Sequence, residues 1–132
     1  MTTLEELKRE LRDKKAELRK YKIELNNRNE AFEKRLNELS PKFEVKYDVD
    51  LYGVLFDTTD HNLDYRYAEA CEKIMDVEGV TKKFFNARTK LVLLVRDYND
   101  LMDGPLPKKI ERVEKEIADL ENEIKEMINA RS

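Results

Sequence analysis

The sequence predicts a mainly α-helical protein, a helical bundle with long N- and C-terminal helices of coiled-coil type and a small central β element. Three observations support this fold class. Heptad patterns mark both ends of the chain, and one segment between them alternates apolar with polar residues. Only three Gly and three Pro occur among 132 residues, as is typical of helix-rich proteins. By its length the chain, residues 1–132, is expected to form a single domain.

The first helix is expected over residues 3–39. Thr3 and Glu6 have the spacing of a capping box at its start, and Ser40 and Pro41 are expected to end it. A large apolar side chain occupies every seventh position, which predicts a narrow stripe packed against another helix. The residues of this column are Leu4, Leu11, Leu18, Leu25, Phe32 and Leu39.

Residues 42–57 are expected to form the short β element, because apolar and charged side chains alternate at its start. A single strand is not stable alone. It would pair with a second run after Gly53 or with the same segment of another subunit. The apolar members of the alternation are Phe43, Val45, Tyr47, Val49 and Leu51.

Two central helices are expected next, over residues 60–78 and 80–102. Thr58, Thr59 and Asp60 are candidate caps of the first, which should end near Gly79. The second keeps helical spacing for six turns, and Thr81 is its candidate cap. A β-hairpin over the same residues is the alternative. The poor period-two alternation there favours the helix.

The last helix is expected over residues 106–131, after a stop at Asp103, Gly104 and Pro105. Pro107 would lie in its first turn, where a missing N–H costs nothing. A second heptad pattern runs along this helix through Ile110, Val113, Ile117, Leu120, Ile124 and Met127.

The net charge does not favour strong nucleic-acid binding by the chain as a whole. There are 26 basic and 29 acidic residues, which give a net charge of −3. The distribution is uneven. Residues 1–41 carry 11 basic and 9 acidic groups, whereas residues 42–104 carry 9 and 13. The middle of the chain is therefore its acidic part.

The sequence predicts a soluble, cytoplasmic protein that does not enter a membrane. Cys71 is the single cysteine, so no intrachain disulfide can form. The N-terminus is charged from the start and has no apolar signal segment. The longest apolar run, Leu91 to Val95, is far shorter than the ~20 residues that cross a bilayer.

The charges beside the first heptad column indicate how that helix would pair with its own copy. In a parallel homodimer, Glu10 would face Lys15 of the second copy and Glu17 would face Lys22, with opposite signs throughout. An antiparallel self-pair would set like charges against each other. A parallel arrangement is therefore favoured if two copies meet along this helix, and a dimer is the favoured homo-oligomer.

An intramolecular antiparallel hairpin of the first and last helices is the alternative pairing. Its electrostatics are divided, because one flank sets lysines against glutamates and the other sets glutamates against glutamates. The attractive flank would hold Lys8, Lys15 and Lys22 against Glu114 and Glu121, and the repulsive flank Glu10, Glu17 and Glu24 against Glu116 and Glu123. The second core column is too polar for a two-stranded coiled coil with a fully apolar core. It contains Leu7, Lys14, Tyr21, Arg28 and Arg35. We therefore expect the first helix to pack partly within the chain and partly on another subunit.

Two sets of residues on the first helix are candidate binding residues. The predicted oligomer interface consists of Leu4, Leu11, Leu18, Leu25 and Phe32. A basic stripe with spacing 4-3-4-3 is the candidate contact for nucleic acid or another anion. It consists of Lys8, Arg12, Lys15, Arg19 and Lys22. Glutamates interleave with the stripe and no aromatic residues accompany it, so a solvated face or an acidic protein partner is favoured over nucleic acid.

No catalytic, cofactor or metal site is predicted. Asp57, Asp60, His61 and Asp64 form the only carboxylate–histidine cluster, and their spacing fits neither an EF-hand nor a zinc site. Acidic residues at a helix start explain Asp60 and Asp64. Cys71 falls on the apolar side of its helix and is expected to be a core residue rather than a nucleophile.

Aromatic residues gather in the middle third of the chain. They predict the main core there, or alternatively a surface that binds a partner, because aromatic residues often anchor protein interfaces. The group consists of Tyr47, Tyr52, Tyr65, Tyr67, Tyr98, Phe43, Phe56, Phe84 and Phe85.

The predicted layout of a long helix, a short β-containing middle and a second long helix resembles that of the prefoldin family. Those proteins are chaperone subunits with coiled-coil arms that hold unfolded chains, so the resemblance implies a holdase-type chaperone. From the residues themselves we expect a non-enzymatic oligomeric protein that binds another macromolecule as scaffold, adaptor or inhibitor. The chaperone is one alternative, and a nucleic-acid-associated protein that uses the basic stripe is the other.

Overall fold

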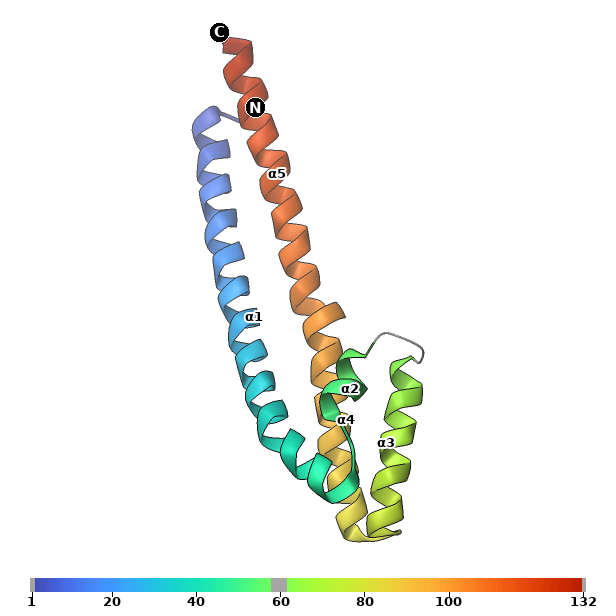
Figure 1. Cartoon of the computed structure of the whole chain (residues 1–132). Coiled ribbons are helices and arrows are strands. Elements are labelled where there is room, and N and C mark those ends of the chain that lie inside the picture. The colour runs from blue at the N-terminus through green and yellow to red at the C-terminus, as the bar shows by residue number, and fades with distance from the viewer. Residues whose placement is uncertain (1, 58–61, 132) are drawn as a thin grey trace. The chain divides into compact units, whose positions relative to one another are not determined.

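The computed structural model describes residues 2–57 and 62–131, and it confirms a mainly helical bundle. The elements are α1 (Leu4–Tyr47), α2 (Leu51–Phe56), α3 (Leu63–Glu78), α4 (Lys82–Asp103) and α5 (Pro105–Arg131), as Figure 1 shows. The chain divides into two compact units. The hairpin unit contains the residues up to Arg28 and those from Asp100 onward, and the central unit is Asn29–Asn99.

The predicted β element is wrong, because no strand forms in the described residues and α1 continues through Pro41 to Tyr47. Phe43 and Tyr47 lie one helical turn apart, are 4% and 7% exposed, and have ring centroids 5.4 Å apart. Val45, which a strand would place on the same side as these rings, is 88% exposed. Burial of two aromatic rings at helical spacing therefore outweighs the N–H that Pro41 cannot donate.

The predicted helix end at Leu39 is also wrong, because the chain leaves the helix only at Asp48. Asp48 adopts a left-handed conformation with φ of 56°. The N–H of Asp48 donates to the carbonyl of Glu44 at 3.1 Å, the single bond of the αL C-cap, and the N–H of Val49 donates to the carbonyl of Phe43 at 3.3 Å. Val49 is buried at this turn. The short helix α2 follows directly and buries Leu51 against the core of the central unit.

The helix expected over residues 80–102 is confirmed as α4, and the hairpin alternative does not form. The Thr81 hydroxyl accepts a hydrogen bond of 3.4 Å from a backbone N–H in the first turn of α4, as a cap should. α3 starts after Asn62, whose side chain accepts a hydrogen bond from the N–H of Tyr65 at 2.9 Å. The predicted caps at 58–60 lie outside the described residues.

The last helix is confirmed as α5, and a single residue, Gly104, separates it from α4. A Cβ atom at Gly104 would collide with the carbonyl of Asp100, so the break needs a glycine. Pro105 is the first residue of α5. An N–H at this position would have no acceptor within the helix, so its absence in proline costs nothing. The predicted heptad residues of α5 form a buried stripe that includes Ile110, Val113, Ile117 and Leu120.

The core of the central unit takes side chains from every helical segment of that unit. Its largest fully buried residues are Leu36, Val49, Leu51, Ile74, Leu91 and Leu94. Polar pairs surround the core: Arg35 forms an ion pair with Asp97, and Lys46 lies 3.1 Å from the buried carboxylate of Glu78. The capping box predicted for α1, in the hairpin unit, also forms, with the N–H of Glu6 3.1 Å from the Thr3 hydroxyl.

Candidate interaction surfaces

Within the hairpin unit, α1 and α5 run antiparallel to each other (Figure 1). Lys14 Nζ lies 2.6 Å from the carboxylate of Glu116, and Lys109 Nζ lies 5.8 Å from the ring centroid of Tyr21. Both contacts set the same register, since a step of seven residues forward along α1 matches a step of seven back along α5. The first and last helices thus pair within the chain, which was one of the two alternatives.

One flank of this hairpin, which we call the closed side, is covered by polar side chains. Tyr21 donates a hydrogen bond to Glu17 at 3.0 Å, and Lys14 also lies 3.8 Å from Glu17. The hydrogen bond from Lys14 lowers the pKa of the Glu116 carboxyl, and the same bond raises the pKa of Lys14. The predicted glutamate repulsion is therefore offset by Lys14 and Tyr21 of the polar second core column.

The residues predicted as an oligomer interface do not all lie together. Phe32 belongs to the central unit, where it is buried with its ring centroid 6.2 Å from that of Tyr98. The other four residues lie along α1 in the hairpin unit and are half-buried, because α5 covers only part of them. They are Leu4, Leu11, Leu18 and Leu25, and we call them the leucine column.

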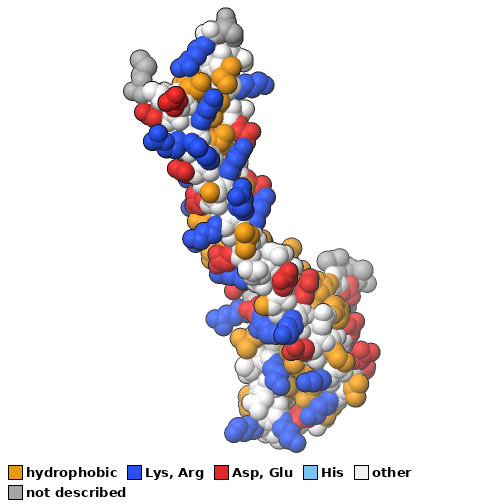
Figure 2. Space-filling view, turned by 90° about the vertical axis from the view of Figure 1, so that its left-hand side faces the viewer, with side chains coloured by type: hydrophobic (Ala, Val, Ile, Leu, Met, Phe, Trp, Pro, Cys, Tyr) orange, Lys and Arg blue, Asp and Glu red, His pale blue; other side chains and the backbone are white. Residues whose placement is uncertain are grey.

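The basic stripe Lys8, Arg12, Lys15, Arg19 and Lys22 is exposed along its whole length, next to the leucine column. Figure 2 shows Lys and Arg side chains, with apolar side chains between them, over the hairpin unit. Leu18 and the half-exposed Ile23 lie in an open groove of about 430 Å³ lined by Lys15, Arg19 and Lys22. The structure thus brings the two predicted sets together. The contribution of Ile23 was missed, because it lies outside both heptad core columns.

Acidic residues of α5 lie on the same flank of the hairpin. The first core column is the leucine column on α1 and the column that starts with Ile110 and Ile117 on α5. In an antiparallel pair of heptad helices, the residues one and four positions after these columns lie on the same flank in both helices. On α5 these positions hold the exposed Glu111, Glu114 and Glu121, as well as Ala118, Lys125 and Ile128. Within the described chain, no ion pair involves these three carboxylates or the five cations of the basic stripe. We call this flank the open side; it consists of the leucine column, the basic stripe and the three glutamates.

A second surface lies on the outer side of α4 in the central unit. Phe85, Val92 and Leu93 are 51%, 37% and 41% exposed. With Arg88, Thr89 and Arg96 they line a groove of about 280 Å³, and we call these six residues the α4 face. The opposite side of α4 is buried in the core of the unit through Phe84, Ala87, Leu91 and Leu94. α4 therefore carries apolar side chains on both sides, and the described residues of the central unit cover only one of these sides.

The aromatic group is divided between core and surface. Phe43, Tyr47 and Phe84 are buried, as a core requires, whereas Tyr52, Phe56, Tyr65 and Phe85 are each more than 40% exposed. Tyr67 is half-buried beside Cys71 and Arg88, and burial raises the pKa of its hydroxyl. Cys71 is half-buried and free.

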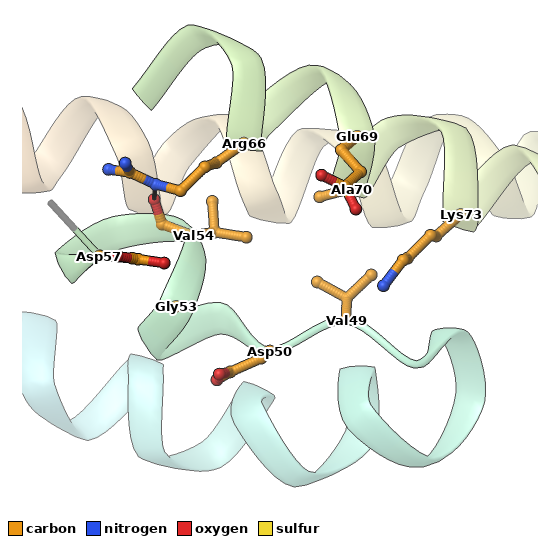
Figure 3. A pocket seen from close by; sticks show the side chains of 9 residues that line it. All are labelled: Val49, Asp50, Gly53, Val54, Asp57, Arg66, Glu69, Ala70 and Lys73. Atoms are coloured by element: carbon orange, nitrogen blue, oxygen red, sulfur yellow. Dashed lines mark hydrogen bonds between the residues drawn. The ribbon is translucent and has the colours of Figure 1, made fainter. Parts of the chain in front are cut away.

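A small pocket of about 190 Å³ lies between α2 and α3, and carboxylates and cations line it together (Figure 3). The cations reach from α3 to backbone carbonyls: Arg66 Nε donates to Val54 at 2.9 Å, and Lys73 Nζ donates to Asp48 at 2.9 Å. These bonds hold α3 to the segment around α2. The carboxylates of the lining are those of Asp50, Asp57 and Glu69.

The predicted carboxylate–histidine cluster is only partly visible. Asp57 lines the small pocket and Asp64 is exposed in the first turn of α3, while Asp60 and His61 lie outside the described residues. Among the residues that the structure does describe, no group of three or more His, Cys, Asp and Glu is placed to hold a metal ion.

Comparisons of the chain with protein-family models, curated proteins and solved structures give no significant match. In the described parts of the chain, no helix combines the length and the apolar character needed to cross a membrane.

Proposed function

We propose that this chain is a non-enzymatic scaffold or adaptor that binds another protein through the α4 face. The single observation behind the proposal is that Phe85, Val92 and Leu93 on the outer side of α4 are exposed, with no cover from the described part of the central unit. A helix of a globular protein normally has one apolar stripe, which packs against the core, so exposed apolar residues on its outer side need another explanation. The missing cover is then expected to come from a partner.

The sequence of α4 requires this two-sided apolar character. Five consecutive apolar residues, Leu91 to Val95, are distributed around the whole circumference of a helix. Leu91 and Leu94 enter the core, so Val92 and Leu93 must face outward. Polar residues at these two positions would leave the core unchanged. Their apolar side chains therefore support a role in binding.

The composition of the α4 face indicates the chemistry of the partner. Phe85 supplies an aromatic anchor, and arginines such as Arg96 are enriched in protein interfaces together with aromatic residues. An amphipathic helix with apolar residues at positions i, i+4 and i+7 and acidic residues beside them would complement this groove. The central unit itself carries 11 basic and 14 acidic residues, so the basic character is local to this face.

Site-specific photocrosslinking in cells tests the proposal. A photoreactive residue in place of Leu93 should give one discrete crosslinked product, and the additional substitution Arg96→Glu should remove it. The matched control carries the photoreactive residue in place of the exposed Glu72 of α3, and it should not give that product. A product that survives Arg96→Glu, or equal products from both positions, would contradict specific binding through the α4 face.

The chaperone alternative makes a different prediction for the same surface. A holdase binds many unfolded chains, so it should suppress aggregation of an unrelated, chemically unfolded protein. A defined groove with Arg96 on one edge favours a single partner instead. An aggregation assay with wild type and Leu93→Asp separates the two functions, since only a holdase that uses this face loses suppression in the variant.

A further inference from the structure

We propose that the open side of the hairpin unit is covered by a second copy of this chain, in a parallel dimer in which α1 of each copy lies on α5 of the other. The surface differs from the α4 face, and the argument does not depend on the proposed function. The evidence consists of the unequal flanks of the hairpin, the register of its charges and the exposure of the leucine column.

The two flanks of the hairpin differ in how their charges are used. On the closed side, Lys14 binds Glu116 at 2.6 Å and Tyr21 binds Glu17 at 3.0 Å. On the open side, five cations and three carboxylates form no ion pair within the described residues, and the leucine column is only partly buried. The closed side is thus completed by its own chain, whereas the open side has the composition of an interface with charged edges.

The register of the hairpin places opposite charges at the same level. Because Lys14 is level with Glu116 and Tyr21 with Lys109, Arg19 is level with Glu111. In the same register, Lys15 lies opposite the residue next to Glu114 in the sequence, and Lys8 lies opposite the residue next to Glu121. A basic row on α1 and an acidic row on α5 therefore match along the hairpin.

The symmetry of the dimer follows from these two rows. A two-fold axis parallel to the hairpin keeps each residue at its own level and places α1 of one copy on α5 of the other. Arg19 of one copy then faces Glu111 of the second, and Lys15 faces Glu114. A two-fold axis perpendicular to the hairpin would place α1 on α1, with five cations against five. Charge therefore selects the parallel arrangement.

The size of the open side is sufficient for a stable dimer. Residues Leu4–Arg28 extend about 37 Å at the helical rise, and two helices side by side are about 20 Å wide. This surface of roughly 700 Å² is close to the ~800 Å² that each partner buries in a typical specific interface. The leucine column would lie in the centre of the resulting four-helix bundle, between the charged rows.

Sedimentation analysis of the full chain provides the test. Wild type should sediment as a dimer, and Lys15→Glu with Arg19→Glu should raise the dissociation constant of the dimer at least about 30-fold, because four attractive contacts become repulsive. The matched control is Arg9→Glu with Lys20→Glu, which changes the charge by the same amount at exposed positions away from the open side. This control should remain dimeric. Circular dichroism checks that each variant keeps its helical content.

A charge exchange within one chain tests the pairing of α1 with α5 directly. Adding Glu111→Lys and Glu114→Lys to the first double variant reverses both rows, and the dimer should return. A wild type that is monomeric at every concentration would overturn the proposal, as would a dimer that survives the double variant or an exchange that restores nothing. A monomeric wild type that binds a short single-stranded RNA, and loses it in the double variant, would assign the stripe to nucleic acid instead.

Discussion

The leucine column of the hairpin unit is buried less completely than the core of the central unit. In the central unit, Leu51, Ile74 and Leu91 have no exposed surface, because helical segments surround them on several sides. In the hairpin unit, the leucine column stays partly exposed, because two helices can cover only one narrow stripe of each other. The difference teaches that leucines can have different surroundings even within one unit. Leu7 and Leu106 of the hairpin unit are buried like Leu91, whereas the leucine column keeps the apolar surface that the proposed dimer would cover.

The largest expected effect comes from one substitution made in both units. Leu91→Ala should lower the free energy of unfolding by about 3 kcal/mol, since it removes a fully buried side chain and leaves a cavity. Leu18→Ala should cost only about 1 kcal/mol in the monomer, because Leu18 already contacts water. Urea unfolding followed by circular dichroism measures both values, with each substitution added to the Lys15→Glu, Arg19→Glu variant so that the monomer is compared. Equal losses would show that the hairpin is as tightly packed as the central unit.

A smaller effect is expected at the proline inside α1. Pro41→Ala should raise the free energy of unfolding by about 1–2 kcal/mol, because alanine supplies the N–H that the helix lacks at this point. Pro105→Ala is the matched control in the hairpin unit. Pro105 is the first residue of α5, so its substitution should change the stability little. If Pro41→Ala destabilised the protein, the segment after Pro41 would not be helical in solution.

The segment around Pro41 also shows why sequence reasoning failed there. Phe43 and Tyr47 are separated by four residues, a spacing that fits one face of a strand as well as one face of a helix. Val45 is the residue that distinguishes the two periods, and its hydrophobic character favoured the strand. Packing decides the outcome, since the helix buries both rings and leaves Val45 in water. α5 and α4 were predictable because their apolar spacing repeats over many turns.

The candidate surfaces were predictable to unequal degrees. The leucine column and the basic stripe share one helix, so the seven-residue spacing of the first and the 4-3 spacing of the second place them next to each other. The glutamates of the open side depend on the register of α1 with α5, which no local pattern contains. The outer residues of α4 had a signal in the run Leu91 to Val95. That run shows that apolar residues surround the helix, but only the fold determines which of them the core takes.

The smallest expected effects concern one ion pair in each unit. Lys14 and Glu116 are 29% and 35% exposed, whereas the carboxylate that Lys46 contacts, that of Glu78, is only 6% exposed. The Glu116 oxygen that contacts Lys14 is buried, but the rest of this side chain meets water, so water can replace Lys14 beside Glu116 better than it can replace Lys46 beside Glu78. Lys46→Met should therefore lower the urea midpoint more than Lys14→Met, and the reverse order would contradict the looser packing of the hairpin unit.

The pH dependence of the Lys14 pair gives a second, finer measurement in the hairpin unit. The hydrogen bond with Lys14 lowers the pKa of Glu116 below its ordinary 4.5, and the same bond raises the pKa of Lys14 above 10.5. The lowered carboxyl pKa stabilises the fold above pH 4.5, and this is lost as the pH falls through the pKa of the folded protein. The raised amine pKa stabilises it below pH 10.5, and this is lost as the pH rises through the folded value. The difference in urea midpoint between wild type and Lys14→Met should thus be constant between these limits and shrink outside them. A difference that persists in acid would show that Lys14 acts through the packing of its aliphatic stem.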